Sequence, residues 1–196
     1  VGQMTQIELG VVSVGEGGRS DQHRLDPVKL RAAIVDHHVG SILNVINHSY
    51  SLAHWHDVIG EIQRMATTET RLGIPIIYGI DAVHGVNYTD GGTLFPQNIA
   101  LAATFDPDMA RRIGHVTAIE TRASGIPWNF SPVLDLGRQP LWPRFYEALG
   151  EDVYLAAELG RALIEGYQGT DVGDMERVAA TMKHYVGYSY PVSGKD

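Results

Sequence analysis

The sequence predicts an α/β fold, namely a (β/α)8 TIM-like barrel of which this chain supplies about the first half, in about four βα units. Apolar runs rich in Ile, Val, Tyr and Phe alternate with amphipathic stretches along the 196 residues, which is typical of parallel strands joined by helices. Connections from helix to strand are short, whereas the loops after the strands (81–105 and 135–151) are long, as in barrels whose loops carry the site. An unusual four-stranded α/β layer is the alternative, because a closed barrel needs eight strands and roughly 250 residues.

Local signals define the elements of the first part of the chain. Asp26 followed by Pro27 is a cap residue with proline at the first helical position, so a helix is predicted to begin there and to run towards His38. A short apolar strand is expected over residues 39–46. The next helix is predicted to end near Arg71, and residues spaced by three and four form its apolar face, namely Leu52, Trp55, Ile59, Ile62 and Ala66.

The second part of the chain repeats this pattern. Strands are predicted over 74–80, 128–134 and 178–185. A helix is expected from Asp106-Pro107 to a glycine cap at Gly125, and another from near Asp152 to Gly169. The first of these two helices should bury Met109, Ile113, Val116, Ile119 and Ala123.

Composition excludes several classes of function. Fifteen Lys and Arg against 23 Asp and Glu give a net charge of −8, so nucleic acid is not an expected partner. No apolar run approaches the roughly 20 residues needed to cross a bilayer, and Val1 does not begin a signal peptide. We therefore expect no membrane span and a mature or trimmed terminus. The absence of cysteine excludes disulfides, thiolate metal sites and a cysteine nucleophile.

Polar residues stand at the ends of three apolar runs, at Asp81, at Asp135 and at the pair Lys183-His184. Barrels and doubly wound sheets place their sites at such strand ends. A carboxylate at Asp81 can accept hydrogen bonds from neighbouring hydroxyls of a sugar, act in acid–base chemistry, or simply cap a turn. Asp135 lies in a segment that contains proline and glycine, which favours a structural turn with Arg138 as an ion-pair partner.

An arginine flanked by aromatic residues lies in the loop after the third predicted strand. Arg144 stands between Trp142 and Phe145, and such a group can hold a polyhydroxyl ligand through paired donors and stacked rings. The guanidinium can instead form an ion pair with Glu147 or Glu151. Both interpretations are retained.

Histidines offer two further candidates. Lys183 and His184 must point to opposite sides unless the strand breaks, so we expect one to face the barrel axis and a break at 185–187 to bring in the other. His54 and His56 have the spacing of some two-histidine metal sites. Trp55 between them belongs to the buried face, so both are expected to flank a surface helix instead.

With these residues assembled, the chain resembles the N-terminal catalytic domain of glycoside hydrolase family 3, the β-glucosidase and exo-β-glucanase group. The resemblance runs through almost the whole chain and rests on several long motifs. They are GQMTQ at Gly2, IPIIYGIDAVHG at Ile74, TLFPQNIALAATFD at Thr93, WNFSPVLDL at Trp128, WPRFYEALGED at Trp142 and MKHYVGYSYPVSGKD at Met182.

The resemblance implies hydrolysis of terminal non-reducing β-D-glucosyl residues from β-glucosides or β-glucan oligosaccharides, with no cofactor and no metal. It implies that the hydroxyls of the terminal sugar are held by Asp81, Arg144, Lys183 and His184, with Asp196 near the same sugar. Family members that release N-acetylglucosamine carry a His-Asp pair in the loop after the Lys-His strand, and the loop here lacks that pattern. This difference favours a glucosidase. The family implies a periplasmic or secreted protein.

The family retains anomeric configuration through an aspartate nucleophile and a glutamate acid–base residue. Both are expected beyond Asp196, so residues 1–196 are expected to be a partial barrel, inactive and unstable alone, which the remainder of the polypeptide or a second chain completes. Two alternatives stay open. One is a metal-dependent barrel hydrolase that uses His54, His56, Asp81 and His84, and the other is a non-catalytic sugar-binding module.

Overall fold

The computed structural model describes residues 1–14, 23–45 and 48–193. The chain forms two compact units. Unit 1 contains residues 1–80, 88–91 and 123–128, and unit 2 contains residues 81–87, 92–122 and 129–196. Asp196, one of the predicted sugar ligands, lies outside the described residues.

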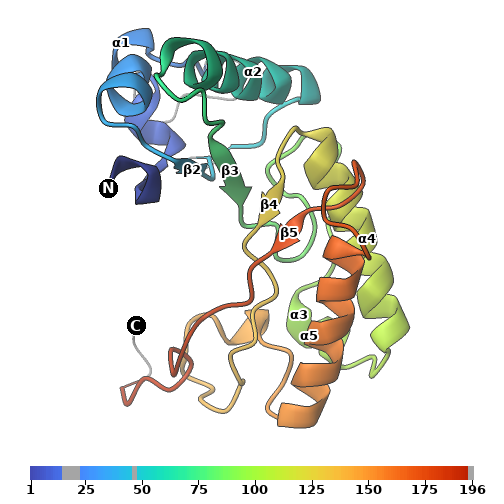
Figure 1. Cartoon of the computed structure of the whole chain (residues 1–196). Coiled ribbons are helices and arrows are strands. Elements are labelled where there is room, and N and C mark those ends of the chain that lie inside the picture. The colour runs from blue at the N-terminus through green and yellow to red at the C-terminus, as the bar shows by residue number, and fades with distance from the viewer. Residues whose placement is uncertain (15–22, 46–47, 194–196) are drawn as a thin grey trace. The chain divides into compact units, whose positions relative to one another are not determined.

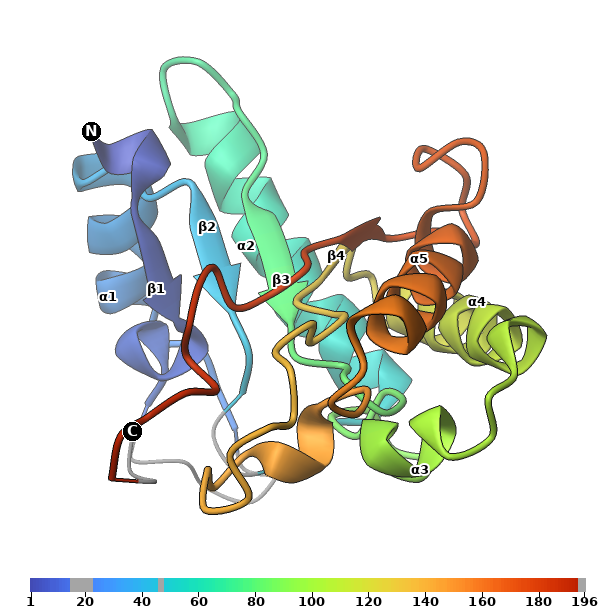
Figure 2. The ribbon, with the colours of Figure 1, turned by 90° about the horizontal axis from the view of Figure 1, so that it is seen from below.

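Unit 1 contains three parallel strands and two helices. The strands are β1 (Gln6–Glu8), β2 (Ser41–Leu43) and β3 (Ile77–Ile80), with Ile7 opposite Ile42 and Ile42 opposite Tyr78. Figure 2 shows them side by side with α1 (Pro27–Arg31) and α2 (Leu52–Glu69). Shorter helical turns cover Gly2–Met4, Leu9–Val12 and Ala32–Asp36. The predicted order of strand and helix is confirmed for this unit.

Helix starts in unit 1 follow the predicted capping. The Asp26 carboxylate accepts hydrogen bonds from the backbone N–H groups of Val28 and Lys29, and Ser51 caps α2 in the same way. Trp55 is fully buried, as its place on the apolar face of α2 predicts. The buried Tyr78 hydroxyl donates to the backbone carbonyl of Asn44 at 2.6 Å, which satisfies a polar group inside the core.

Strand β1 was not predicted. It has only three residues, and the side chains of Gln6 and Glu8 are exposed, so no apolar run marks it. Strand β2 is shorter than predicted, and residue 46, the last of the expected strand, lies outside the described residues. Parallel pairing with β2 holds β1 in its strand conformation. Such a long-range contact cannot be read from sequence periodicity.

Unit 2 is organised around a pair of long helices, α4 (Pro107–Ala123) and α5 (Val153–Gln168), which run side by side in Figures 1 and 2. A short helix, α3 (Asn98–Ala102), interrupts the long loop after β3, and a helical turn covers Phe145–Glu147. Asp152 caps α5 and Gly169, with a φ of 56°, ends it, as predicted. The core of this unit includes Leu101, Ala110, Ala118, Leu159, Leu163 and Tyr167.

The buried face of α4 differs from the prediction. Its buried residues are Ala110, Gly114, Thr117, Ala118 and Thr121, whereas Ile119 is 37% exposed. The reason is the close approach of α5. A methyl group at Gly114 would lie 2.7 Å from the carbonyl oxygen of Leu163 and 3.1 Å from Cα of Gly166. Small residues therefore occupy the contact, and the larger apolar side chains lie at its margin.

The last two strands are short. Strand β4 covers Trp128–Asn129 and β5 covers Ala179–Ala180, so the predicted strands over 128–134 and 178–185 are regular only at their starts. The two segments still run in parallel beyond these ends. Lys183 N–H donates to the carbonyl of Pro132 at 3.0 Å, and Leu134 N–H donates to the carbonyl of Lys183 at 2.7 Å. This pairing fixes the backbone that carries Lys183.

A buried histidine links two segments of unit 1. Because Ser13 Oγ donates its proton to the carbonyl of Leu9, the contact with His23 Nε2 at 2.8 Å requires the imidazole to donate. His23 Nδ1 then accepts from His54 Nε2 at 2.9 Å. Tyr50 stacks on the His23 ring with centroids 4.8 Å apart. His54 is therefore a partner of a buried histidine, and the prediction that it flanks a surface helix is wrong.

We expect unit 1 to lose stability as the pH falls through the range set by His23. Burial, with a smaller contribution from His54, lowers the pKa of His23 from 6.5 to about 4. Between pH 6.5 and pH 4, His23 binds a proton in the unfolded chain but stays neutral in the folded chain. The free energy of unfolding should therefore decrease by up to about 3 kcal/mol by pH 4. Hydrogen exchange of peptides from α2 in the intact protein, corrected for the intrinsic pH dependence, measures this change.

The matched variants are His23→Gln, which offers one donor and one acceptor without a titrating group, and His37→Gln, at an exposed histidine. The first should flatten the pH dependence and the second should leave it as in the native protein. Equal protection of α2 at pH 7 and pH 4.5 in the native protein would contradict the role given to His23.

Candidate active site

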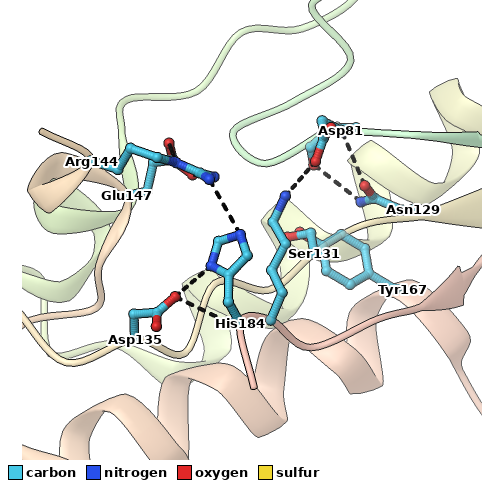
Figure 3. A network of polar contacts seen from close by, with 10 residues as sticks. Asp81, Asn129, Ser131, Asp135, Arg144, Glu147, Tyr167 and His184 are labelled. Atoms are coloured by element: carbon cyan, nitrogen blue, oxygen red, sulfur yellow. Dashed lines mark hydrogen bonds and ion pairs between the residues drawn. The ribbon is translucent and has the colours of Figure 1, made fainter. Parts of the chain in front are cut away.

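The candidate site lies entirely within unit 2, after the ends of the strands. Asp81 directly follows β3, Lys183 and His184 follow β5, and Arg144 stands in the loop before the turn Phe145–Glu147. Figure 3 shows His184 between Asp135 and Arg144, with Asp81 and Asn129 in a second group. Four of the five predicted ligands therefore lie in two polar groups, Asp81 with Lys183 and Arg144 with His184, which the peptide bond between Lys183 and His184 joins.

Asp81 and Lys183 form an ion pair. Lys183 Nζ donates to Asp81 Oδ1, and their side chains are 14% and 30% exposed. The backbone next to Asp81 is held by Asn129, which is fully buried. Its amide accepts from Ala82 N–H at 3.0 Å and donates to the Ala82 carbonyl at 3.1 Å. The turn after β3 is thus fixed by two reciprocal hydrogen bonds, and the carboxylate faces the ammonium group.

His184 is held by Asp135. The backbone N–H of His184 donates to Asp135 Oδ2 at 3.0 Å, and the ring Nδ1 lies 2.6 Å from the same oxygen. Asp135 is 7% exposed. Arg138, the partner expected from the sequence, instead donates from Nε to the backbone carbonyl of Glu151 at 3.2 Å. The predicted ion pair between Asp135 and Arg138 is wrong.

Arg144 lies between an acidic partner and His184. Its Nε and Nη2 atoms donate to the two carboxylate oxygens of Glu147, both at 2.6 Å. Nη1 lies 3.3 Å from His184 Nε2. The hydrogen bonds with Glu147 raise the pKa of Arg144 above its ordinary value, with a smaller contribution from Tyr188. The guanidinium therefore stays charged and is held in a fixed plane.

Aromatic rings enclose one side of this network. The ring of Tyr188 meets that of His184 edge-on with centroids 4.8 Å apart, and the guanidinium carbon of Arg144 lies 5.7 Å from the Tyr188 centroid. Trp142, which is 2% exposed, packs edge-on against Tyr188 at 5.4 Å. Hydrophobic periodicity does not mark Tyr188, which lies in the loop beyond the strand, although the motif at Met182 contains it. The chain turn after His184 brings it back to the network.

The network suits a neutral polyhydroxyl ligand. Each cation, Lys183 and Arg144, has a carboxylate beside it, so the group offers strong donors and acceptors with little net charge. Charge-assisted hydrogen bonds of this kind recognise hydroxyl groups without requiring a charged ligand. Strand β5 ends at Ala180, before the pair and not at the predicted break over 185–187, and Lys183 and His184 contact Asp81 and Asp135 respectively.

The alternative of a metal-dependent hydrolase finds no support in the part of the chain that the structure describes. There, no group of three or more His, Asp or Glu residues could hold a metal ion. His54 contacts His23, and His56 faces the backbone carbonyl of Ala123 at 2.7 Å. His84 Nδ1 faces the carbonyl of Phe95 at 2.9 Å.

Among the described residues, no helix is long and apolar enough to span a membrane.

Comparison with known proteins gives a consistent result. The model of the glycosyl hydrolase family 3 N-terminal domain matches residues 1–196. The lysosomal β-glucosidase of Dictyostelium discoideum is 39% identical over all of this chain and 25% of its own length. A β-xylosidase of Formosa agariphila is 39% identical over 66% of this chain and 19% of its own length.

Solved structures agree. The exo-1,3/1,4-β-glucanase of a Pseudoalteromonas species superposes with a TM-score of 0.80 at 32% identity, over 98% of this chain and 23% of that protein. The chain thus spans about a quarter of the length of such relatives. Its parallel α/β architecture is that of the TIM-barrel-like domain of these enzymes, as the sequence predicted. The chain belongs to glycosyl hydrolase family 3 and represents its N-terminal domain.

Proposed function

We propose that the full-length protein, of which this chain is one part, hydrolyses terminal non-reducing β-D-glucosyl residues from β-glucosides or β-glucan oligosaccharides. In this proposal residues 1–196 are the first part of a barrel domain, and they supply the sugar-holding part of the −1 subsite. The observation that carries the proposal is that two polar contacts, Lys183 with Asp81 and His184 with Arg144, come from residues that are adjacent in the chain, so that the four side chains belong to one region of unit 2.

Each side chain has a distinct part in holding the sugar. The Asp81 carboxylate accepts hydrogen bonds from hydroxyl groups, while Lys183 and Arg144 donate to hydroxyl oxygens. The ion pairs keep these groups oriented before the sugar arrives. Fixed donors and acceptors lower the barrier when they are aligned better with the transition state than with the substrate. The four residues thus orient the ring and do not themselves transfer a proton.

The covalent chemistry requires two further carboxyl groups. In a retaining mechanism an aspartate attacks the anomeric carbon and forms a glycosyl-enzyme, while a glutamate first protonates the leaving oxygen and then activates water. We propose that both groups come from parts of the protein beyond residues 1–196. The role of this chain is then to hold the sugar so that the anomeric carbon faces that nucleophile.

A glucoside is the proposed substrate over a xyloside or an N-acetylglucosaminide. The relatives named above include a β-glucosidase and a β-xylosidase. The absence of a His-Asp pair from the loop after Lys183-His184 argues against N-acetylglucosamine. The Dictyostelium relative is named lysosomal, and we propose a periplasmic or secreted location for this protein, where β-glucans are encountered.

The full-length protein should prefer an aryl β-glucoside to the matching β-xyloside by about 10-fold or more in kcat/KM, because the xyloside lacks one hydroxymethyl group that a polar site can bind. An aryl N-acetyl-β-glucosaminide should be turned over more slowly still. Release of nitrophenol from the three substrates measures this preference. Residues 1–196 expressed alone should release none. Turnover by that segment, or a preference for the glucosaminide, would contradict the proposal.

A further inference from the structure

We infer that Asp135 is a positioning residue that holds His184 in one tautomer, with its Nε2 lone pair directed to the ligand. The ligand in this inference is the sugar of the proposed function, on which this part rests. Asp135 itself does not touch the sugar. Its effect passes through the imidazole, which it contacts at 2.6 Å.

The tautomer follows from the partners of the two ring nitrogens. Arginine has only donors, so the contact of Arg144 Nη1 with His184 Nε2 at 3.3 Å requires an unprotonated Nε2. The proton of the neutral ring then belongs to Nδ1. That assignment matches the other side of the ring, because the Asp135 carboxylate is an acceptor. The ring is therefore a hydrogen-bond acceptor on the side of the site.

Two features make Asp135 the controlling partner. Its Oδ2 atom accepts from both the backbone N–H and the ring of His184, so it fixes the main chain and the side chain together. Its side chain is only 3% exposed, so water cannot easily replace it. Tyr188 restrains the ring from another side through its edge-on contact. Removal of the carboxylate leaves the Nδ1 proton without its acceptor.

Glu147 completes the arrangement from the other end. It fixes the guanidinium of Arg144 through two hydrogen bonds of 2.6 Å, and this leaves Nη1 aimed at His184. The network is thus a chain of hydrogen bonds from Glu147 through Arg144 and His184 to Asp135 (Figure 3). At its centre one donor and one acceptor contact each other, and a sugar hydroxyl that takes the place of this contact would accept from Arg144 Nη1 and donate to His184 Nε2.

The tautomer is tested by 15N NMR of the full-length protein labelled in histidine, because protonated and unprotonated ring nitrogens have separate chemical shifts. His184 should show a protonated Nδ1 and a bare Nε2 at neutral pH. His84 is an internal control, since its Nδ1 faces the Phe95 carbonyl and must also carry the proton. Asp135→Ala should change the signals of His184 and leave those of His84 unaltered.

Inhibition by glucose and its analogues tests the direction of the hydrogen bond. A deoxyfluoro sugar can still accept weakly but cannot donate, so at the hydroxyl that meets His184 it should lose most of the affinity that the deoxy sugar loses. Asp135→Ala should raise the inhibition constant of glucose about 10- to 100-fold. In this variant the deoxy and deoxyfluoro analogues should bind as well as glucose does. Asp135→Asn should act as a partial rescue, because its amide oxygen can still accept both N–H groups.

The outcomes separate the two claims. If glucose fails to inhibit the active native enzyme, the proposed −1 subsite is wrong, while the NMR signals still decide the tautomer. If His184 carries its proton on Nε2, or if Asp135→Ala leaves both the tautomer and the inhibition constant unchanged, the inference about Asp135 is overturned. If Asp135→Ala does not fold, the tautomer of His184 in the native protein decides, since a proton on Nε2 overturns the inference in that case as well.

Discussion

Replacement of Lys183 by methionine is expected to lower kcat/KM for an aryl β-glucoside by about 100-fold in the full-length protein. Methionine keeps most of the unbranched stem and removes the ammonium group. The partner carboxylate of Asp81 is then left without its charge partner in a site where the two side chains are 14% and 30% exposed. The loss includes one donor to the sugar and the orientation of one acceptor.

Asp81→Asn should cause a loss of the same order, because the amide keeps the shape of the carboxylate and removes its charge. The double variant should lose little more than either single variant, since the two side chains act as a unit. Steady-state kinetics of the native protein, the two single variants and the double variant complete this double-mutant cycle. Losses that simply multiply would show that the two residues act independently.

The control is an ion-paired arginine at the surface of unit 2. Arg111 bonds to Asp108 and Glu165 with a side chain that is 45% exposed. Exposed pairs contribute little, so Arg111→Met should change kcat/KM by less than about twofold. A loss under about threefold in Lys183→Met would remove that residue from the sugar-binding site.

The part of the site that the sequence could predict is the part that lies at strand ends. Asp81 directly follows one apolar run and the pair Lys183-His184 ends another, so the position of these residues at strand ends brings them to attention. Arg144 drew attention through its aromatic neighbours, and the family resemblance then favoured sugar binding over a purely structural ion pair with Glu147 or Glu151. The roles of these four residues remain predictions, whereas their convergence is observed.

Asp135 shows why the remainder of the site could not be predicted. The sequence places Arg138 three residues away, and a local ion pair was the simplest expectation. The structure pairs Asp135 with His184 across 49 positions of sequence, through the parallel approach of two strand-like segments. The spacing of residues within a short stretch of sequence does not predict that approach. Strand β1 escaped prediction for the same reason, since only pairing with β2 defines it.

A methyl group at Gly166 is expected to destabilise unit 2 by about 3 kcal/mol or more. The added carbon would lie 2.3 Å from the carbonyl oxygen of Arg111 and 3.0 Å from Cα of Gly114. Both atoms belong to the backbone of α4, so α4 and α5 must move apart to admit it. The movement would open the core that lies between these helices, which includes Leu159 and Leu163.

Gly60 in α2 provides the control, because nothing lies within 4 Å of a methyl group at that position. Gly60→Ala gains the same helix propensity as Gly166→Ala without a clash, so it should raise stability by up to about 1 kcal/mol. Hydrogen exchange of peptides from α2, α4 and α5 in the intact protein measures both effects. Equal and small changes would show that α4 and α5 do not approach as closely as described. A loss of stability in Gly166→Ala and a gain in Gly60→Ala would show that close backbone packing decides whether a glycine can be replaced. The local sequence around the two glycines does not reveal that packing.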